Sequence, residues 1–321
     1  MLLSNTLVAS ALIVAAQACT ELGHMTKREA PAPGNGTAPE GPLWAYGATD
    51  GPMAWYNMDP EANKACGEGL NQTPIDLNQQ VAKVEAASGY PLKYGKVANV
   101  KFSNTHHTAQ VQVDAVTKDN TLQLKGEEYY LAQFHFHVPS EHHIEGEMFP
   151  IEVHFVHKTK GDKPKLAVLG FMIEVGCENY PLLNVTLGQI AQVEAPNSVA
   201  QIADLDLTEL AKRFSEGQVF RYLGSLTTPP CTEGVEWLVS TQVLTVDVQT
   251  YNEVKRTLKY NSRYIQANPG TVNIQKAVPG GPKAPVPAVP AVPAVSATVV
   301  SDPAIAMTPA PVAAPVAAGG H

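Results

Sequence analysis

The chain has 321 residues, a formal net charge of −8 and a pI of about 5.7. Its length permits one large domain or two small ones. The charge balance is only mildly acidic and no cluster of Lys and Arg occurs, which argues against nucleic acid as a partner.

The first 42 residues carry signals for export and processing. Residues 1–18 form an apolar run without charged side chains and end in an Ala-Gln-Ala cleavage pattern, which predicts a secretory signal peptide. This run is shorter than the roughly 20 residues of a membrane-spanning helix. Residues 19–42 contain the dibasic site Lys27-Arg28 and predict a pro-segment with a flexible leader. We therefore expect an extracellular or cell-wall-associated protein.

Residues 43–276 have a globular composition and form one predicted domain. Alternating or β-branched runs predict strands at 99–104, 109–116, 121–126, 127–138, 151–158, 166–175 and 236–243. Helices are predicted at 206–214, capped by Asp206 or Thr208, and at 246–259, with Asp247 near the start. The sequence therefore favours a mainly β domain with a few peripheral helices.

The segment 277–321 is rich in Pro, Ala and Val and nearly free of charge. Frequent prolines oppose both helix and sheet, so we expect a disordered or polyproline-like tail, and we consider association with the cell wall through it. Acceptor sequons for glycans occur at Asn35, Asn71 and Asn184.

Six of the ten histidines lie between residues 129 and 157. Side chains alternate between the two faces of a strand, so Gln133, His135 and His137 share one face and Phe134 and Phe136 share the other. The phenylalanines are expected in the core. The two imidazoles then face a polar compartment, close enough together to hold one metal ion.

A second predicted strand, 151–158, carries Glu152 and His154 on one face. Antiparallel pairing with the first strand would bring His154 opposite the other two histidines. Three neutral imidazoles with one open position describe a catalytic zinc site, although copper would also accept them. Gln133 and Glu152 lie where partners that orient the rings are expected. The pattern alone does not exclude other ligands from this stretch, namely His142, His143 and His157.

Three motifs resemble the α-class carbonic anhydrases and look most like secreted bacterial and fungal members. They are QFHFHVPSEH at 133–142, EVHFVH at 152–157 and GSLTTPPC at 224–231, and the similarity spans about residues 44–266. The resemblance implies a central, mostly antiparallel ten-stranded sheet. It also implies reversible hydration of carbon dioxide to bicarbonate and a proton by zinc-hydroxide attack, with esterase activity as a side reaction.

The resemblance assigns roles to individual residues. It assigns one Zn²⁺ per chain to His135, His137 and His154, with Gln133 and Glu152 as the partners of His135 and His154. Three residues receive catalytic roles: Thr227, Glu141 behind it, and His107 as proton shuttle. The implied substrate-binding positions are Val156, Val168, Leu226, Thr228, Val235 and Trp237. Tyr46 and Gln110 match positions that hold a water chain.

The sequence departs from the family pattern at two places. His106 stands where the family often has glycine, and Tyr264 replaces a proline in the segment 261–266. Asn261 and Arg263 of that segment are retained, so we expect its structural role to persist.

The resemblance also implies a disulfide between Cys66 and Cys231. If Cys19 is removed by processing, Cys177 is left unpaired, which suggests a homodimer linked through Cys177. Two other interpretations remain open, a catalytically silent adhesion or wall-binding module and a copper or redox protein.

Overall fold

The structure is a computed structural model, and it describes residues 44–113 and 119–277. The predicted signal peptide (1–18), the leader (19–42) with Asn35 and, except for Ala277, the tail (277–321) lie outside the described residues. The helices are α1 (Trp55–Met58), α2 (Lys64–Glu68), α3 (Pro181–Thr186), α4 (Thr208–Ser215) and α5 (Val248–Leu258), with the 3-10 helices η1 (Ala87–Gly89), η2 (Leu187–Val193) and η3 (Ile274–Lys276).

The described strands form one large and one small sheet. The small sheet contains β1 (Asp76–Leu77), β8 (His143–Ile144) and β9 (Glu147–Met148). The large sheet contains β2 (Lys83–Ala86), β3 (Leu92–Lys93), β4 (Lys96–Asn104), β5 (Ala109–Gln112), β6 (Thr121–Leu124), β7 (Glu127–His137), β10 (Ile151–Lys158), β11 (Leu166–Gly176), β12 (Val199–Asp206), β13 (Gln218–Ser225) and β14 (Glu233–Asp247).

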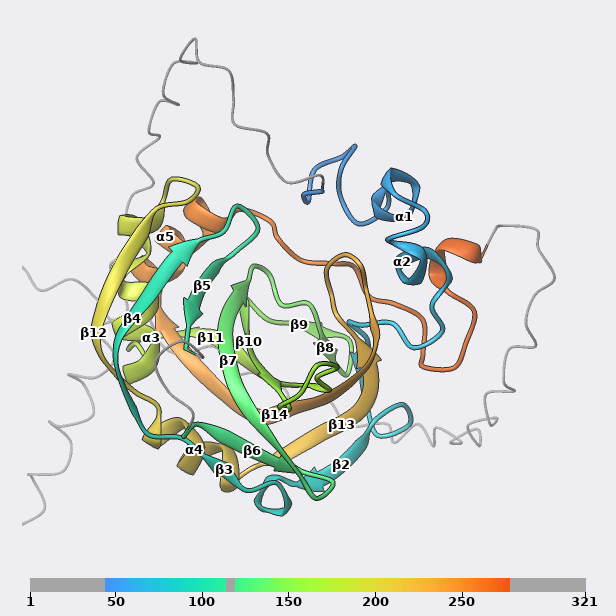
Figure 1. Ribbon diagram of the computed structural model, residues 1–321. Coiled ribbons are helices and arrows are strands. Elements are labelled where there is room, and N and C mark those ends of the chain that lie inside the picture. The colour runs from blue at the N-terminus through green and yellow to red at the C-terminus, as the bar shows by residue number, and fades with distance from the viewer. Residues whose placement is uncertain (1–43, 114–118, 278–321) are drawn as a thin grey trace, which may run out of the picture. The chain divides into compact units, whose positions relative to one another are not determined.

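The large sheet is curved and runs in the order β12-β4-β5-β7-β10-β11-β14-β13-β2, as Figure 1 shows. Its pairs are antiparallel except for β11 and β14, which run parallel. The predicted mainly β, mostly antiparallel architecture is confirmed. The sheet has eleven strands of described residues rather than the expected ten, because the two-residue β3 adds to β6 beside the main path.

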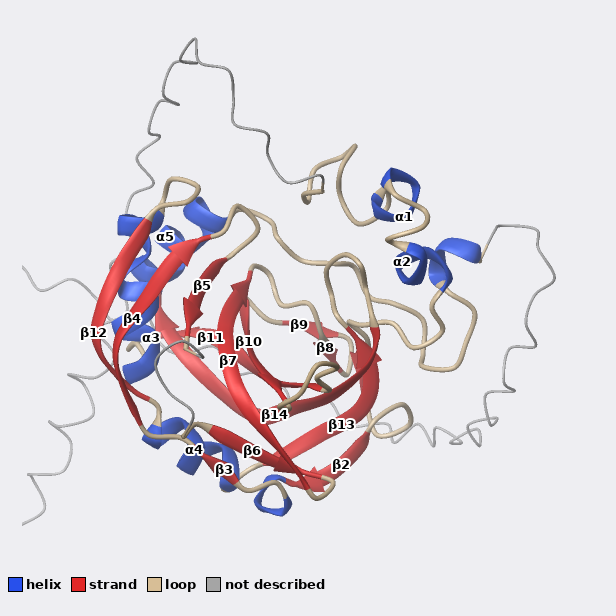
Figure 2. Cartoon of the chain, in the orientation of Figure 1, coloured by secondary structure: helices blue, strands red, loops and turns tan. Residues whose placement is uncertain are grey.

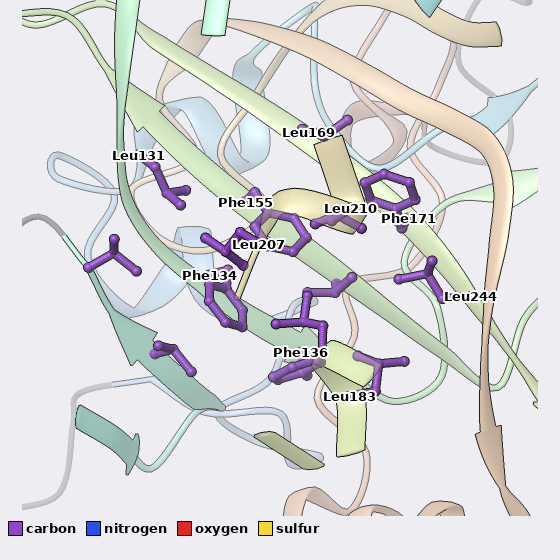
Figure 3. Packing of buried hydrophobic residues seen from close by; sticks show 14 of the residues in the cluster. Leu131, Phe134, Phe136, Phe155, Leu169, Phe171, Leu183, Leu207, Leu210 and Leu244 are labelled. Carbon is purple, nitrogen blue, oxygen red and sulfur yellow. The ribbon is translucent and has the colours of Figure 1, made fainter. Parts of the chain in front are cut away.

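The main core lies on the face of the sheet that helices α3, α4 and α5 cover (Figure 2). Phe134 and Phe136 of β7, Phe155 of β10 and Phe171 of β11 are all buried there, together with leucines of the helices (Figure 3). Fully burying one such side chain contributes roughly 1.5–3 kcal/mol. Because side chains alternate, this packing turns the histidines of β7 to the opposite face.

Both predicted helices are present. α5 begins after Asp247, whose carboxylate accepts the backbone N–H of Thr250 at 2.7 Å. The carboxylate of Asp206 accepts the N–H of Thr208 at the start of α4 (2.9 Å). Residues 114–116 of one predicted strand lie outside the described residues. In the part that the structure describes, no helix is long and apolar enough to cross a membrane.

The predicted disulfide between Cys66 and Cys231 is confirmed. In the full chain, Cys177 is also disulfide-bonded, and the described residues contain no free cysteine. The expected unpaired Cys177 presupposes that processing removes Cys19. The homodimer through Cys177 therefore stays a prediction for the processed chain.

Candidate metal centre and active site

Three histidines converge on the face of the sheet opposite the main core. In the antiparallel pairing of β7 with β10, His135 stands directly opposite His154, and His137 stands opposite Glu152. The rings of His137 and His154 have centroids 4.6 Å apart, and each of the three histidines offers a ring nitrogen within 4.8 Å of the others. The register that alternation alone could not fix therefore selects His154, while His157 lies on the core side.

Each of the three rings is oriented by one hydrogen bond to an acceptor. Nδ1 of His135 donates to Oε1 of Gln133 (2.9 Å), Nδ1 of His137 to the carbonyl oxygen of Asn261 (2.8 Å) and Nε2 of His154 to Oε1 of Glu152 (2.7 Å). A neutral imidazole has one N–H, so the other nitrogen carries a lone pair. The nitrogens left for a metal ion are Nε2 of His135, Nε2 of His137 and Nδ1 of His154.

The electrostatics of the cluster favour the neutral form of His135 and His137. Burial lowers the pKa of His135 and His137, because it penalises the charged ring. Burial also acts to lower the pKa of His154, but the carboxylate of Glu152 outweighs it and raises that pKa. Burial acts to raise the pKa of Glu152, but His142 and His154 outweigh it and hold that pKa well below the usual value. An ionised Glu152 makes His154 a more basic ligand.

The site contains buried polar atoms without hydrogen-bond partners, and these atoms are consistent with a bound metal ion. Nε2 of His137 and Oε2 of Glu141 are buried and lack a hydrogen-bond partner among the described residues, although they lie 3.4 Å apart. Buried polar atoms without partners are rare and call for an explanation such as an ion or a ligand. A cation held by the ring nitrogens would satisfy the imidazole. Oε1 of Glu141 is occupied by the backbone N–H of Arg263 (2.9 Å).

Sequence reasoning missed the second histidine that Glu152 holds. Oε1 of Glu152 also accepts from Nδ1 of His142 (2.7 Å), and Nε2 of His142 lies 2.7 Å from the hydroxyl of Tyr222. The other oxygen of Glu152 accepts the backbone N–H groups of Glu141 and His142. His142 is therefore a fully buried support of the site. Its place in the QFHFHVPSEH motif is the signal from which this role could have been predicted.

The predicted apolar substrate positions come together in one cluster beside the histidines. Val168, Val235 and Trp237 are buried in it, and Val156 and Leu226 pack against them. The ring of Trp237 contacts His154 at a centroid distance of 4.8 Å. The cluster therefore presents an apolar wall next to the three histidines.

Thr227 is buried in the loop that follows β13. This loop is tied to the wall, because Nε1 of Trp237 donates to the carbonyl oxygen of Ser225 (2.9 Å). Within the loop, the N–H of Cys231 donates to the carbonyl oxygen of Thr228 (2.8 Å). Oε2 of Glu141 is buried without a hydrogen-bond partner among the described residues, so that carboxylate oxygen is an open acceptor.

His107 is half-buried and held through its ring. It stacks on Trp44 with centroids 3.5 Å apart, and Nε2 donates to the carbonyl oxygen of Trp44 (2.8 Å). A carbonyl only accepts, so Nδ1 is the free acceptor of the neutral ring. Burial lowers the pKa of His107, against the opposing effect of the bond to Trp44. Trp44 was not predicted as a partner, because 63 residues separate the two.

The two predicted water-chain residues lie near this face. Gln110 pairs with His135 in the register of β5 and β7, and its amide donates to Oε1 of Gln112 (2.9 Å). The hydroxyl of Tyr46 is buried without a partner among the described residues. Burial and, next, the charge of Glu141 raise the pKa of Tyr46 well above its usual value. Its hydroxyl therefore stays protonated.

Comparison with known proteins shows the family to which the chain belongs. The sequence matches the profile of the eukaryotic-type carbonic anhydrases over residues 50–274. The chain belongs to this family. The carbonic anhydrase of Neisseria gonorrhoeae is 37% identical over 203 residues, which cover 61% of this chain and 73% of the relative. The resemblance drawn from the motifs is thus confirmed.

Solved carbonic anhydrase structures share the fold. The fungal α-carbonic anhydrase of Aspergillus oryzae is 36% identical with a TM-score of 0.67, over 72% of this chain and 96% of that one. The α-carbonic anhydrase of Thermovibrio ammonificans, solved with the inhibitor sulfanilamide, is 31% identical with a TM-score of 0.61, over 70% and 95%. Carbonic anhydrases are carbonate dehydratases, lyases that act on carbon dioxide and bicarbonate, and the α family is in general zinc-dependent.

Proposed function

We propose that this chain catalyses the reversible hydration of carbon dioxide to bicarbonate and a proton with one Zn²⁺ held by His135, His137 and His154. The observation that carries the proposal is the convergence of three ring nitrogens whose other nitrogens are fixed by acceptors. Bound by three neutral imidazoles, Zn²⁺ lowers the pKa of a water molecule to about 7, an effect for which carbonic anhydrase is itself the established example.

Glu141 and Thr227 orient the nucleophile in this proposal. A hydroxyl has one hydrogen to donate, and Oε2 of Glu141 is a buried acceptor without a partner. If Thr227 donates to Glu141, its oxygen must accept from the attacking water species, which directs the lone pair of that species toward the carbon of the substrate.

The substrate and the product use different parts of the site. Carbon dioxide is small and apolar, so the wall of Val156, Val168, Leu226, Val235 and Trp237 is sufficient to hold it. Thr228, partly exposed beside Thr227, offers a hydroxyl to bicarbonate. The proton leaves through water near Tyr46 and Gln110 to Nδ1 of His107, and from there to solvent.

The test is stopped-flow hydration of carbon dioxide by the full chain, with and without a zinc chelator. We expect activity that the chelator abolishes and added Zn²⁺ restores, and we expect His154→Ala to lose both activity and stoichiometric zinc. His143→Ala, a histidine outside the cluster, is the matched control and keeps both. Zinc-loaded wild type without activity would contradict the proposal. Hydrolysis of activated esters stays a prediction, measured in the same samples.

We also propose that the protein acts outside the cell. The signal pattern at 1–18 supports this, and the disulfide between Cys66 and Cys231 is of a kind that persists in oxidising compartments. Association with the cell wall through the tail at 277–321 stays a prediction, tested by fractionating cells that express the chain with and without that segment.

A further inference from the structure

Asn261 joins two parts of the site that lie far apart in the sequence. It follows α5 in a segment that is neither helix nor strand, and it is 2% exposed beside the end of β7. Its backbone N–H donates to the carbonyl oxygen of Val138 (3.1 Å), and its Oδ1 accepts the N–H of Val138 (2.7 Å). These two bonds fix the position of Asn261 against the strand that carries His135 and His137.

The backbone of Asn261 orients a metal ligand. Its carbonyl oxygen accepts from Nδ1 of His137 (2.8 Å). Because a carbonyl cannot donate, this contact places the hydrogen on Nδ1 and the lone pair on Nε2. The contact is made by the main chain, so any side chain at position 261 retains it as long as the segment stays in place.

The side chain of Asn261 holds the segment that carries His107. Its Nδ2 donates to the carbonyl oxygens of Phe136 (2.9 Å) and His107 (3.0 Å). Both hydrogens of the amide are therefore used, one on β7 and one on the loop between β4 and β5. Among the described residues, no other side chain donates to the carbonyl oxygen of His107.

We propose that Asn261 is a positioning residue that holds the proton-transfer residue His107 and the ligand His137 in one fixed frame. Proton transfer through water depends steeply on the separation and orientation of the two ends of the path. Loss of the amide would free the backbone of His107 while leaving the ligand rings and the apolar wall in place. This inference rests on the proposed function, because it concerns the step that regenerates the nucleophile.

The experiment compares the full chain with Asn261→Ala and Asn261→Asp. The aspartate variant keeps the oxygen that accepts from Val138 and replaces the donating NH₂ by a second acceptor oxygen, which faces the carbonyl oxygens of Phe136 and His107. Asn273→Ala is the matched control, because Asn273 is 3% exposed and its Nδ2 likewise donates to two backbone carbonyls, those of Cys66 and Gly69. His107→Ala serves as the reference for a lost shuttle.

Hydration of carbon dioxide is measured in a buffer whose molecules are too bulky to accept the proton in place of His107, and again with imidazole added. We expect kcat of both Asn261 variants to fall about tenfold in the first buffer and to recover largely in imidazole, as for His107→Ala. The value of kcat/KM is expected to change less than about threefold, because it reports the hydration step rather than the export of the proton. The Asn273 variant keeps both values.

A second readout does not depend on activity. In the zinc-free protein, the ring resonances of His107 in a carbon–proton NMR spectrum should shift in the Asn261 variants and stay in place in Asn273→Ala. A merely structural role would lower kcat and kcat/KM together without recovery in imidazole.

The outcomes separate the two proposals. Inactive zinc-loaded wild type overturns the proposed function. If wild type is active, His107→Ala is defective and the Asn261 variants are fully active, only the role of Asn261 is overturned. Equal loss of kcat and kcat/KM without recovery also overturns it, as does unfolding of both Asn261 variants under conditions in which Asn273→Ala folds.

Discussion

Nδ1 of His142 and Oε1 of Glu152 lie 2.7 Å apart, and neither side chain is exposed. The same oxygen receives Nε2 of His154, so one carboxylate supports a proposed ligand and a residue behind it. With two backbone N–H groups on its other oxygen, Glu152 accepts four hydrogen bonds. The proposed ligand His154 is therefore held by a buried anion whose two oxygens each accept two hydrogen bonds.

Replacing this anion affects both stability and metal binding. In Glu152→Gln an NH₂ group must face N–H donors, which leaves buried groups unpaired and costs roughly 3–5 kcal/mol. We expect the zinc dissociation constant to rise about 10- to 100-fold, the usual effect of losing such a partner. Urea unfolding and chelator competition measure the two quantities. Glu147→Gln, on the exposed β9, is the control, and equal zinc affinity in both variants contradicts the prediction.

His157 gives the protein a defined sensitivity to acid. Burial lowers its pKa from 6.5 to about 4, and Nε2 lies 2.7 Å from the hydroxyl of Tyr94. The unfolded chain binds the proton more tightly, so the stability attached to the neutral ring is present above pH 6.5 and lost progressively down to about pH 4. The loss is roughly 3 kcal/mol at the acid limit.

The double variant His157→Phe/Tyr94→Phe tests this dependence. We expect the slope of unfolding free energy against pH, measured in urea between pH 6.5 and pH 4, to decrease by up to one proton relative to wild type. Tyr94→Phe alone keeps the imidazole and should keep the slope. An unchanged slope in the double variant would assign the acid sensitivity to other groups.

His106 adopts a backbone conformation that favours glycine. Its φ is +73°, its side chain is exposed, and its N–H donates to Oδ1 of Asn104 (3.0 Å). His106→Gly relieves the steric cost but makes the unfolded chain more flexible, so we expect a net gain of about 0.5 kcal/mol. His106→Ala retains the cost and should give no gain. Chemical unfolding compares the two, and equal stability of both variants contradicts the explanation.

The two sequons in the described residues differ in accessibility. Asn184 is exposed on α3, whereas Asn71 is half-buried and its backbone N–H donates to Glu233 (2.6 Å). A glycan is bulky and needs a surface position. After secretion from a eukaryotic host, we expect Asn184→Gln to remove mass that an endoglycosidase also removes, and Asn71→Gln to leave the mass unchanged. Loss of a glycan in Asn71→Gln would contradict this.

Local patterns in the sequence were sufficient for one part of the site and not for another. The alternation of Phe134, His135, Phe136 and His137 predicted which side chains face the core, because the period of a strand is two residues. It could not choose His154 over His157 as the third ligand, since register depends on the tertiary pairing of β7 with β10. The family resemblance supplied that choice.

Contacts between distant segments were beyond local reasoning altogether. The carbonyl of Asn261 lies 124 residues from His137, and Trp44 lies 63 residues from His107. No periodicity connects such pairs, because they meet only after the sheet has formed.

The strands β12 and β13 were not predicted either. In β13, Arg221 interrupts the apolar residues, and the strand ends in Gly224 and Ser225.

The bridge between Cys66 and Cys231 spans 165 residues, from the first helices to the loop after β13. During synthesis, Cys231 is added only when most of the domain has already been made. The disulfide at Cys66 therefore cannot form until the loop with Thr227 and Thr228 has been synthesised. The proposed catalytic loop is thus closed late, in the same oxidative step that secures the beginning of the domain.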